Sequence, residues 1–398
     1  MVKLPARRSL LAAGAGGSVA AVISAAFLMR GGSWAPGPAP SSTPPASSAS
    51  GAASLRTDLT VRSRLLGRDV PYSLYLPAGV SSAPGGGRPD GGVPVLFLLH
   101  GASGKHTDWV VKGSIVPTLE RAIAAGRIPA CALVMPDARR DPGMPGGGQD
   151  ETFYINDAGS GGDALRYEDM FIEEFVPAVE QAHGLGGRAE RRSVAGLSMG
   201  GYGALMYALR YPGLFGAAAG LSTAHFTDEG YLAMPMEEWN RFFGHAFGRD
   251  QAGSARRTDR SREYNLADII RRTAPDRLRR TRYHLACGTE DANYLPGTED
   301  LRTVFAARGV DAEVVLEPGG HGWSYWSVAA ERILDFLGRQ LGWPRSASPA
   351  EQNDARPSPA GVRKPLRAGG PSSRYTQTVP ALARPPAVLV EPPPRHPS

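Results

Sequence analysis

One stretch near the middle of the chain, residues 194–205, constrains the fold more than any other. It reads VAGLSMGGYGAL: an apolar strand end, then Gly-x-Ser-x-Gly, then small residues that predict a helix up to Leu209. A serine in this setting lies on a tight strand-to-helix turn with its hydroxyl exposed. Glycine is expected at 196 and 200 because a side chain there would collide with neighbouring backbone. The first amides of the helix would face negative charge that develops beside Ser198.

In a chain with 50 glycines such a motif can also be an ordinary turn, so the surrounding pattern must decide. Strand patterns alternate with helix patterns, which predicts a parallel sheet with helices on both faces, and an antiparallel pair precedes it. Eight strands with the serine after the fifth is the arrangement of an α/β-hydrolase. The expected strands are 59–65, 70–76, 93–99, 131–135, 192–197, 214–221, 283–287 and 312–316, and the expected helices are 115–125, 167–183, 199–209 and 327–341.

Residues 224–280 are charged and helical in pattern, with no strand signal. They predict a helical insertion over the active site, at the ends of the strands. The same segment would set the size of the substrate pocket, and it carries no motif that identifies the substrate.

The basic residues of the chain are concentrated at its two ends. Residues 1–50 carry four basic residues and no acid, and residues 343–398 carry eight Lys/Arg against three acids. The net charge of +6 for the whole chain therefore leaves −3 for residues 51–342. A mildly acidic body argues against a nucleic-acid partner.

Composition divides the chain into four segments. We expect an export signal or N-terminal anchor over 1–30, a disordered Pro/Ser/Ala linker over 31–54 and an α/β-hydrolase domain over 55–342. The Pro/Arg-rich tail over 343–398 has too few apolar residues to offset its chain entropy, so we expect it to be disordered.

The N-terminus has the layout of an export signal. Arg7 and Arg8 precede a weakly apolar stretch over 10–29, which indicates the twin-arginine route. The stretch is also about long enough to span a bilayer, so an uncleaved membrane anchor is the alternative. Either way the body of the protein would lie outside the cytoplasm.

A serine nucleophile needs a base, an acid that orients the base, and donors for the oxyanion. In this arrangement the acid and then the histidine follow the serine, each in a loop at the carboxyl end of a strand. The strand 283–287 runs into Gly-Thr-Glu-Asp, and 312–316 runs into Glu-Pro-Gly-Gly-His-Gly-Trp. We expect His321 to take the proton from Ser198 and Asp291 to orient His321. Glu290 is the competing candidate for the acid.

The oxyanion hole should combine two backbone amides. One belongs to Met199, directly after the serine, and the other to Ala102, in the glycine turn after the strand 93–99. His100 is expected to shape that turn. Trp109, Trp323 and Trp326 lie close in sequence to these loops and are expected to be wall residues.

The cysteines and the other histidines give no sign of a metal. Cys131 and Cys287 fall on strands that would not be neighbours, so we expect two buried free thiols. The histidines at 106, 183, 225, 245 and 284 lack metal-ligand spacing and are interpreted as structural or solvated. No metal or organic cofactor is expected.

Seven ordered motifs across residues 55–341 resemble the esterase family that includes S-formylglutathione hydrolase (esterase D), feruloyl and acetylxylan esterases, and mycolyltransferases. They are LLHGASGKHTDW, VMPDAR, TFYIND, FIEEFVPAVE, GLSMGGYGALMYALRYP, ACGTEDANY and EPGGHGWSYW. The resemblance implies a serine esterase or acyltransferase, with Ser198, Asp291 and His321 at the family's triad positions. Many relatives carry an acid after the motif histidine, where this chain has Gly322, which bears on the substrate more than on the triad.

The sequence thus predicts an exported serine esterase that hydrolyses small-molecule or carbohydrate-linked esters through an acyl-serine intermediate. One alternative is an acyltransferase that passes the acyl group to a sugar or lipid hydroxyl, since the two reactions differ only in the acceptor. The other is a cell-surface binding module that has kept the fold without turnover.

Overall fold

The computed structural model describes residues 51–80, 92–144, 150–159 and 164–340. The predicted signal or anchor over 1–30, most of the linker and the tail over 343–398 lie outside these residues. None of the described helices is long and apolar enough to cross a membrane.

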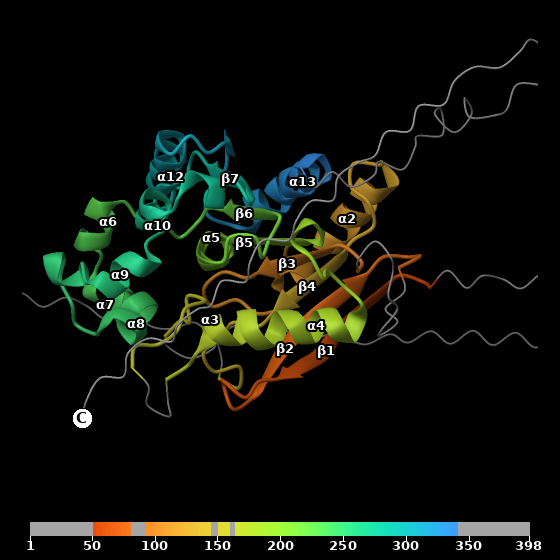
Figure 1. Ribbon diagram of the computed structural model, residues 1–398, viewed down its shortest axis with the longest axis horizontal. Coiled ribbons are helices and arrows are strands. Elements are labelled where there is room, and N and C mark those ends of the chain that lie inside the picture. The colour runs from red at the N-terminus through yellow and green to blue at the C-terminus, as the bar shows by residue number, and fades with distance from the viewer. Residues whose placement is uncertain (1–50, 81–91, 145–149, 160–163, 341–398) are drawn as a thin grey trace, which may run out of the picture. The chain divides into compact units, whose positions relative to one another are not determined.

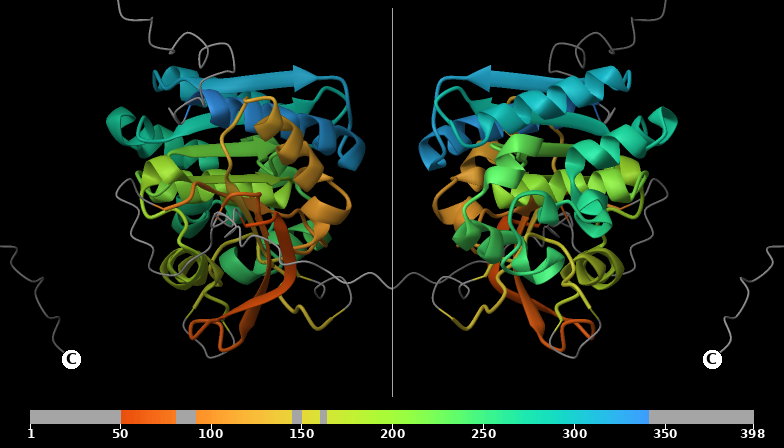
Figure 2. Two further views of the ribbon diagram at one scale, coloured as in Figure 1. Left: turned by 90° about the vertical axis from the view of Figure 1, so that its right-hand side faces the viewer. Right: turned by 90° about the vertical axis from the view of Figure 1, so that its left-hand side faces the viewer.

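The described residues form one sheet of eight strands, in the order β1-β2-β4-β3-β5-β6-β7-β8. β1 and β2 pair in antiparallel fashion, as do β2 and β4, and every other pair is parallel. Figure 2 shows the sheet twisting from blue β8 to the orange-red hairpin of β1 and β2. The strands are β1 (Ser54–Arg62), β2 (Asp69–Leu76), β3 (Val95–Leu99), β4 (Ala132–Pro136), β5 (Arg192–Leu197), β6 (Ala217–Leu221), β7 (Arg282–Gly288) and β8 (Ala312–Glu317).

Helices cover both faces of this sheet, as the alternating pattern predicts. The helices outside the insertion are α1 (Asp108–Val111), α2 (Ile115–Ala124), α3 (Tyr167–Asp169), the π-helix η2 (Met170–Phe175), α4 (Val176–His183), the short 3₁₀ turn η3 (Ala189–Arg191), α5 (Met199–Arg210), α12 (Leu295–Ala307) and α13 (Trp323–Gln340). Figure 1 shows α2 beside α13, with α4 across the sheet from them. The central strands are apolar on both sides because both sides are covered.

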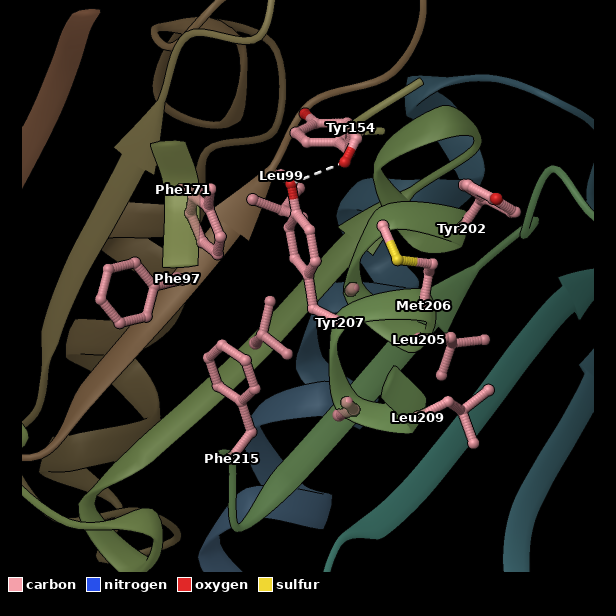
Figure 3. Close-up of a cluster of buried hydrophobic side chains, with 14 of the residues drawn as sticks. Phe97, Leu99, Tyr154, Phe171, Tyr202, Leu205, Met206, Tyr207, Leu209 and Phe215 are labelled. Atoms are coloured by element: carbon pink, nitrogen blue, oxygen red, sulfur yellow. Dashed lines mark hydrogen bonds between the residues drawn. The ribbon is translucent and has the colours of Figure 1, made fainter. Parts of the chain in front are cut away.

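Alternate residues of β3 show the two layers. Leu96 and Leu98 pack in the cluster that contains α2 and α13, whereas Phe97 and Leu99 pack in the cluster with α4, α5 and α12. In the second cluster the Tyr207 hydroxyl donates to the Tyr154 carbonyl at 2.9 Å (Figure 3). This bond ties α5, the helix that follows Ser198, to the 150–159 segment.

The segment between β6 and β7 is the helical insertion that the sequence predicts. It consists of α6 (Asp228–Ala233), α7 (Met236–Trp239), the π-helix η4 (Asn240–Gly244), α8 (His245–Phe247), the 3₁₀ turn η5 (Gly253–Arg256), α9 (Asp259–Tyr264), α10 (Leu266–Arg272) and α11 (Pro275–Leu278). Figure 1 shows α6 to α9 gathered beyond one end of the sheet. Buried Arg256 helps to hold the insertion together, since it donates to the Tyr231 and Leu232 carbonyls and lies over the Trp239 ring.

The elements differ from the expected ones mainly at their ends. β1 begins at Ser54, the last residue of the predicted linker, and ends three residues before the predicted 65. β6 begins at Ala217 rather than at 214, and α13 begins at Trp323 rather than at 327. Helix α12 has no counterpart among the expected elements.

Both cysteines are free and buried, as expected. Cys131 directly precedes β4 and Cys287 lies in β7, and three strands separate β4 from β7 in the sheet.

Candidate active site

Ser198 lies on the strained turn that its motif predicts. It stands between β5 and α5 with φ 54° and ψ −121°, a backbone conformation that side-chain-bearing residues rarely adopt. Its amide donates to the Leu221 carbonyl at 2.8 Å, and its carbonyl accepts from the Ala224 amide at 3.0 Å. The end of β6 therefore holds the turn in place.

The two motif glycines are required by close backbone contacts. A Cβ on Gly196 would lie 2.2 Å from the Gly200 carbonyl oxygen. A Cβ on Gly200 would lie 2.3 Å from the Leu99 carbonyl oxygen and 2.6 Å from that of His100. No side chain fits at either position, so the sharp turn depends on both glycines.

The structure brings Ser198, His321 and Asp291 together. The Ser198 hydroxyl lies 3.2 Å from His321 Nε2, and His321 Nδ1 lies 2.8 Å from Asp291 Oδ2. Asp291 follows β7 and is buried, whereas His321 follows β8 and its side chain is 29% exposed. Three segments far apart in sequence thus form one hydrogen-bonded line.

The charge of Asp291 suits this arrangement. Burial by itself would raise the pKa of Asp291, but the hydrogen bond from His321 and the nearby Ser222 hydroxyl outweigh it, and the pKa lies below its ordinary value. An ionised Asp291 accepts the Nδ1 proton of His321 and leaves Nε2 free to accept from Ser198. Glu290, the competing candidate, is exposed and uses its backbone amide to bond the Gly319 carbonyl.

The turn after β3 lies directly against Ser198. A Cβ added to Gly101 would stand 3.4 Å from Ser198 Cβ. The Ala138 amide donates to His100 Nε2 at 2.8 Å, so the proton of the His100 ring is on Nδ1, which donates to the Gly101 carbonyl at 2.8 Å. His100 therefore shapes the turn, as expected.

Both predicted oxyanion donors are available for a ligand. The Met199 amide begins α5 and has no carbonyl four residues earlier in the helix. Among the described residues, no group accepts a hydrogen bond from the Ala102 amide. Both amides belong to residues that adjoin the Ser198 turn.

Tyr294 is a site residue that the sequence reasoning missed. Its ring lies 4.7 Å from the His321 ring, and its hydroxyl lies beside the Ser198 side chain. Burial and the nearby charge of Asp291 raise the pKa of Tyr294 to about 12. The signal was its position three residues after Asp291, within the quoted motif ACGTEDANY.

The three tryptophans form the wall behind His321. The Trp326 ring lies 4.8 Å from that of His321, and its Nε1 donates to the Ser222 hydroxyl at 3.1 Å. Trp323 packs edge-on against both Trp326 and Trp109 at 5.5 Å, and Trp109 Nε1 donates to the Leu99 carbonyl. Trp109 and Trp326 are buried, which agrees with a wall role.

A cavity of about 390 Å³ lies between the insertion and the loop that carries Asp291. Its walls include Phe226, Phe242 and Tyr294, with the Glu238 carboxylate also on the lining. Tyr294 thus belongs both to the Ser198–His321 site and to this cavity. The volume lies in the range of ordinary ligand pockets.

The remaining histidines have structural partners or are buried. Each has a polar group close to a ring nitrogen: His106 has Ser73, His183 has Tyr72, His225 has Asp300, His245 has Asp157 and His284 has Glu313. Within the described ranges, no group of three His, Cys, Asp or Glu side chains could hold a metal ion.

The chain matches the model of the family described as "Putative esterase" over residues 63–337. It is 23% identical to an acetyl esterase of Caldicellulosiruptor saccharolyticus over 245 residues, which are 61% of this chain and 83% of that protein.

Solved structures agree with this family. A ferulic acid esterase structure superposes with a TM-score of 0.56 at 25% identity, over 73% of this chain and 99% of that one. The fluorophosphonate-binding serine hydrolase FphF of Staphylococcus aureus has a TM-score of 0.55 at 21% identity, over 72% and 99% of the two chains, and supports the fold. The chain therefore belongs to this esterase family and is a carboxylic-ester hydrolase of the α/β-hydrolase fold.

Proposed function

We propose that this chain is a serine esterase that works through an acyl-serine intermediate, with Ser198, His321 and Asp291 as its catalytic triad. The observation that carries the proposal is the line of two hydrogen bonds, 3.2 Å and 2.8 Å, that joins the three side chains. Ser198 Oγ attacks the ester carbonyl while His321 Nε2 takes its proton. His321 then gives that proton to the leaving alcohol, and Asp291 stabilises the imidazolium in between.

Water completes the cycle. It attacks the acyl-serine ester with His321 again as the base, and the acid leaves as Ser198 regains its proton. In both steps the negative charge on the carbonyl oxygen is held by the Ala102 and Met199 amides and by the N-terminal end of α5. The reaction needs no metal or organic cofactor in this proposal.

We place one side of the ester in the cavity behind Tyr294. The cavity shares Tyr294 with the Ser198 site, and its aromatic walls suit an apolar or ring-containing group. The ester that carries this group can be a small molecule or can be linked to a sugar. The volume of about 390 Å³ favours a short acyl chain or a single ring over a long lipid chain.

The proposed setting of the enzyme is outside the cytoplasm. The support is the Arg7–Arg8 pair before the apolar stretch over 10–29, which would direct export or anchor the chain in the membrane. The esterase domain would then extend over 55–342, between a linker and a C-terminal tail. Nucleic acid is not among the proposed partners, because the body is mildly acidic.

A panel of p-nitrophenyl esters with increasing acyl length tests the function, with the full chain beside Ser198→Ala. We expect turnover that is highest for short acyl chains and falls at least ~10⁴-fold in Ser198→Ala, because the nucleophile is gone. A folded wild type without Ser198-dependent turnover on any ester would contradict the proposal. An added sugar or lipid alcohol that captures most of the acyl group would instead identify the enzyme as an acyltransferase.

A further inference from the structure

The turn after β3, which carries Ala102, contacts an ion pair between Glu151 and Arg241. Glu151 lies in the 150–159 segment, and Arg241 lies in the helical insertion. Ser103, the residue after Ala102, donates through its amide to Glu151 Oε1 at 2.8 Å. Arg241 Nη2 donates to the same Glu151 oxygen at 3.0 Å and to the Ser103 hydroxyl at 2.6 Å. The Glu151 amide in turn donates to the Arg241 carbonyl at 3.0 Å.

The Glu151 carboxylate is buried, with its side chain 4% exposed. A buried carboxylate needs compensating partners, and hydrogen bonds to a charged group are stronger than neutral ones. The segment that carries Glu151 is itself fixed to the turn, because the Tyr154 hydroxyl donates to the His100 carbonyl at 2.8 Å. Glu151 is therefore fixed to the turn both by its own bond and by the bond from Tyr154.

Ser103 has a backbone conformation that needs stabilising hydrogen bonds. Its φ is 57°, a left-handed conformation that is unfavourable for a serine. The bonds to its amide and its hydroxyl hold it in that conformation. Without them the turn would relax toward more common backbone angles.

These bonds lie on both sides of Ala102 in the chain. Ala102 stands between two peptide planes, and each plane is held from a different side. His100 holds the Gly101 carbonyl, which shares its plane with the Ala102 N–H. On the other side of Ala102, Glu151 accepts from the Ser103 amide and Arg241 donates to the Ser103 hydroxyl.

We propose that Glu151 and Arg241 are positioning residues that aim the Ala102 amide at the developing oxyanion, so that the helical insertion completes the oxyanion hole. The proposal rests on the proposed ester hydrolysis through Ser198. Glu151 and Arg241 do not touch the reacting atoms in it; they act through Ser103. An amide displaced by about 1 Å stabilises the transition state much less. Removal of Glu151 or Arg241 therefore lowers the rate of the chemical step more than it weakens substrate binding.

The test compares Arg241→Met and Glu151→Gln with the control Arg249→Met, all in the full chain. Arg249 pairs with Asp150, so it joins the same insertion to the residue next to Glu151 without touching the turn. We expect Arg241→Met and Glu151→Gln to lower kcat by about 10- to 100-fold with KM within about twofold. A trifluoromethyl ketone, whose adduct with Ser198 carries an oxyanion, should bind more weakly in the same proportion. Arg249→Met should keep all three values within about twofold.

Two further variants test the same role if a substitution at buried Glu151 prevents folding. Ser103→Ala removes only an exposed hydroxyl and should lower kcat several-fold, and Arg241→Lys should recover part of the loss. Unchanged kcat and ketone affinity in Arg241→Met and Ser103→Ala would overturn the proposal. Equal losses in Arg249→Met would also overturn it, because docking of the insertion alone would then explain the effect.

Amide hydrogen exchange of residues 101–104 tests the positioning role without relying on enzyme activity. Arg241→Met should speed the exchange of this segment, and Arg249→Met should not. A wild type without Ser198-dependent turnover would contradict the esterase proposal, and the exchange rates would still decide whether Arg241 holds the turn. Equal protection in the wild type and in Arg241→Met would overturn the positioning role.

Discussion

At the scale of single residues, the site depends on positions where a methyl group does not fit. We predict that Gly200→Ala destabilises the protein by about 3 kcal/mol, because the added Cβ would meet the Leu99 and His100 carbonyl oxygens at 2.3 and 2.6 Å. Both are backbone atoms of β3 and its turn, so neither can move without displacing the sheet end. Urea unfolding monitored by circular dichroism measures the change.

Gly230→Ala is the matched control. Gly230 lies inside α6, where an added Cβ would meet its nearest neighbour, Thr227 Oγ1, at an ordinary 3.4 Å. Alanine is the better helix former, so this variant should be as stable as the wild type or slightly more so. A Gly200→Ala protein as stable as Gly230→Ala would show that the turn relaxes freely around a side chain.

The sequence predicts some site residues and not others for a physical reason. Ser198, Asp291 and His321 are recognisable because each follows a strand in a fixed order along the chain, and parallel strands bring their carboxyl ends to one edge. Glu151 and Arg241 have no such local pattern. Their meeting at the turn after β3 depends on how the insertion packs. A single sequence carries no periodic signal for such packing.

At the scale of elements, the strand order keeps the two cysteines apart. Burial raises the pKa of Cys131 to about 12 and that of Cys287 to about 11, so neither forms a reactive thiolate near neutral pH. We predict that neither thiol of the native protein reacts with dithionitrobenzoate at pH 8, and that both react in guanidinium without a reductant. Fewer than two reactive thiols in the denatured, unreduced chain would indicate a disulfide or an oxidised cysteine instead.

Prediction of the elements from sequence succeeds where burial is uniform. β3 and β4 are apolar throughout because helices cover both faces, and such runs are visible in sequence. β1 is an edge strand with mostly exposed residues, so its start at Ser54 has no apolar run to mark it. Helix α12 opens with Leu-Pro-Gly, which is typical of a turn, and this opening hides the helix that follows.

At the scale of the whole molecule, burial makes several histidines sensitive to acid. It lowers the pKa of His106, His183, His245 and His284, and that of His245 falls to about 4. His245 belongs to α8 of the insertion, and its side chain is 3% exposed, 3.9 Å from Asp157. It therefore lies where the insertion packs on the loop between β4 and α3.

The sign of the effect follows from the two states of His245. The unfolded chain takes up the proton near pH 6.5, whereas the folded chain resists it down to about pH 4. Stability from His245 is complete above pH 6.5 and is lost progressively as the pH falls from 6.5 to 4, by about 3 kcal/mol in total. Asp157 and Asp291 have lowered pKa values, so their contributions are lost only as the pH falls below about 3.8. The loss of stability between pH 6.5 and pH 5 therefore comes from the histidines.

We predict that the free energy of unfolding of the wild type falls between pH 7.5 and pH 5, and that His245→Gln removes about 2 kcal/mol of that fall. Urea unfolding at the two pH values measures it, with the variant compared against itself so that any packing cost of glutamine cancels. If the insertion alone opens in acid, hydrogen exchange will rise first in 228–264 while β3 and β5 stay protected. An equal fall in His245→Gln and in the wild type would contradict this prediction. The acid sensitivity would then come from the other histidines, above all from buried His284 beside Glu313.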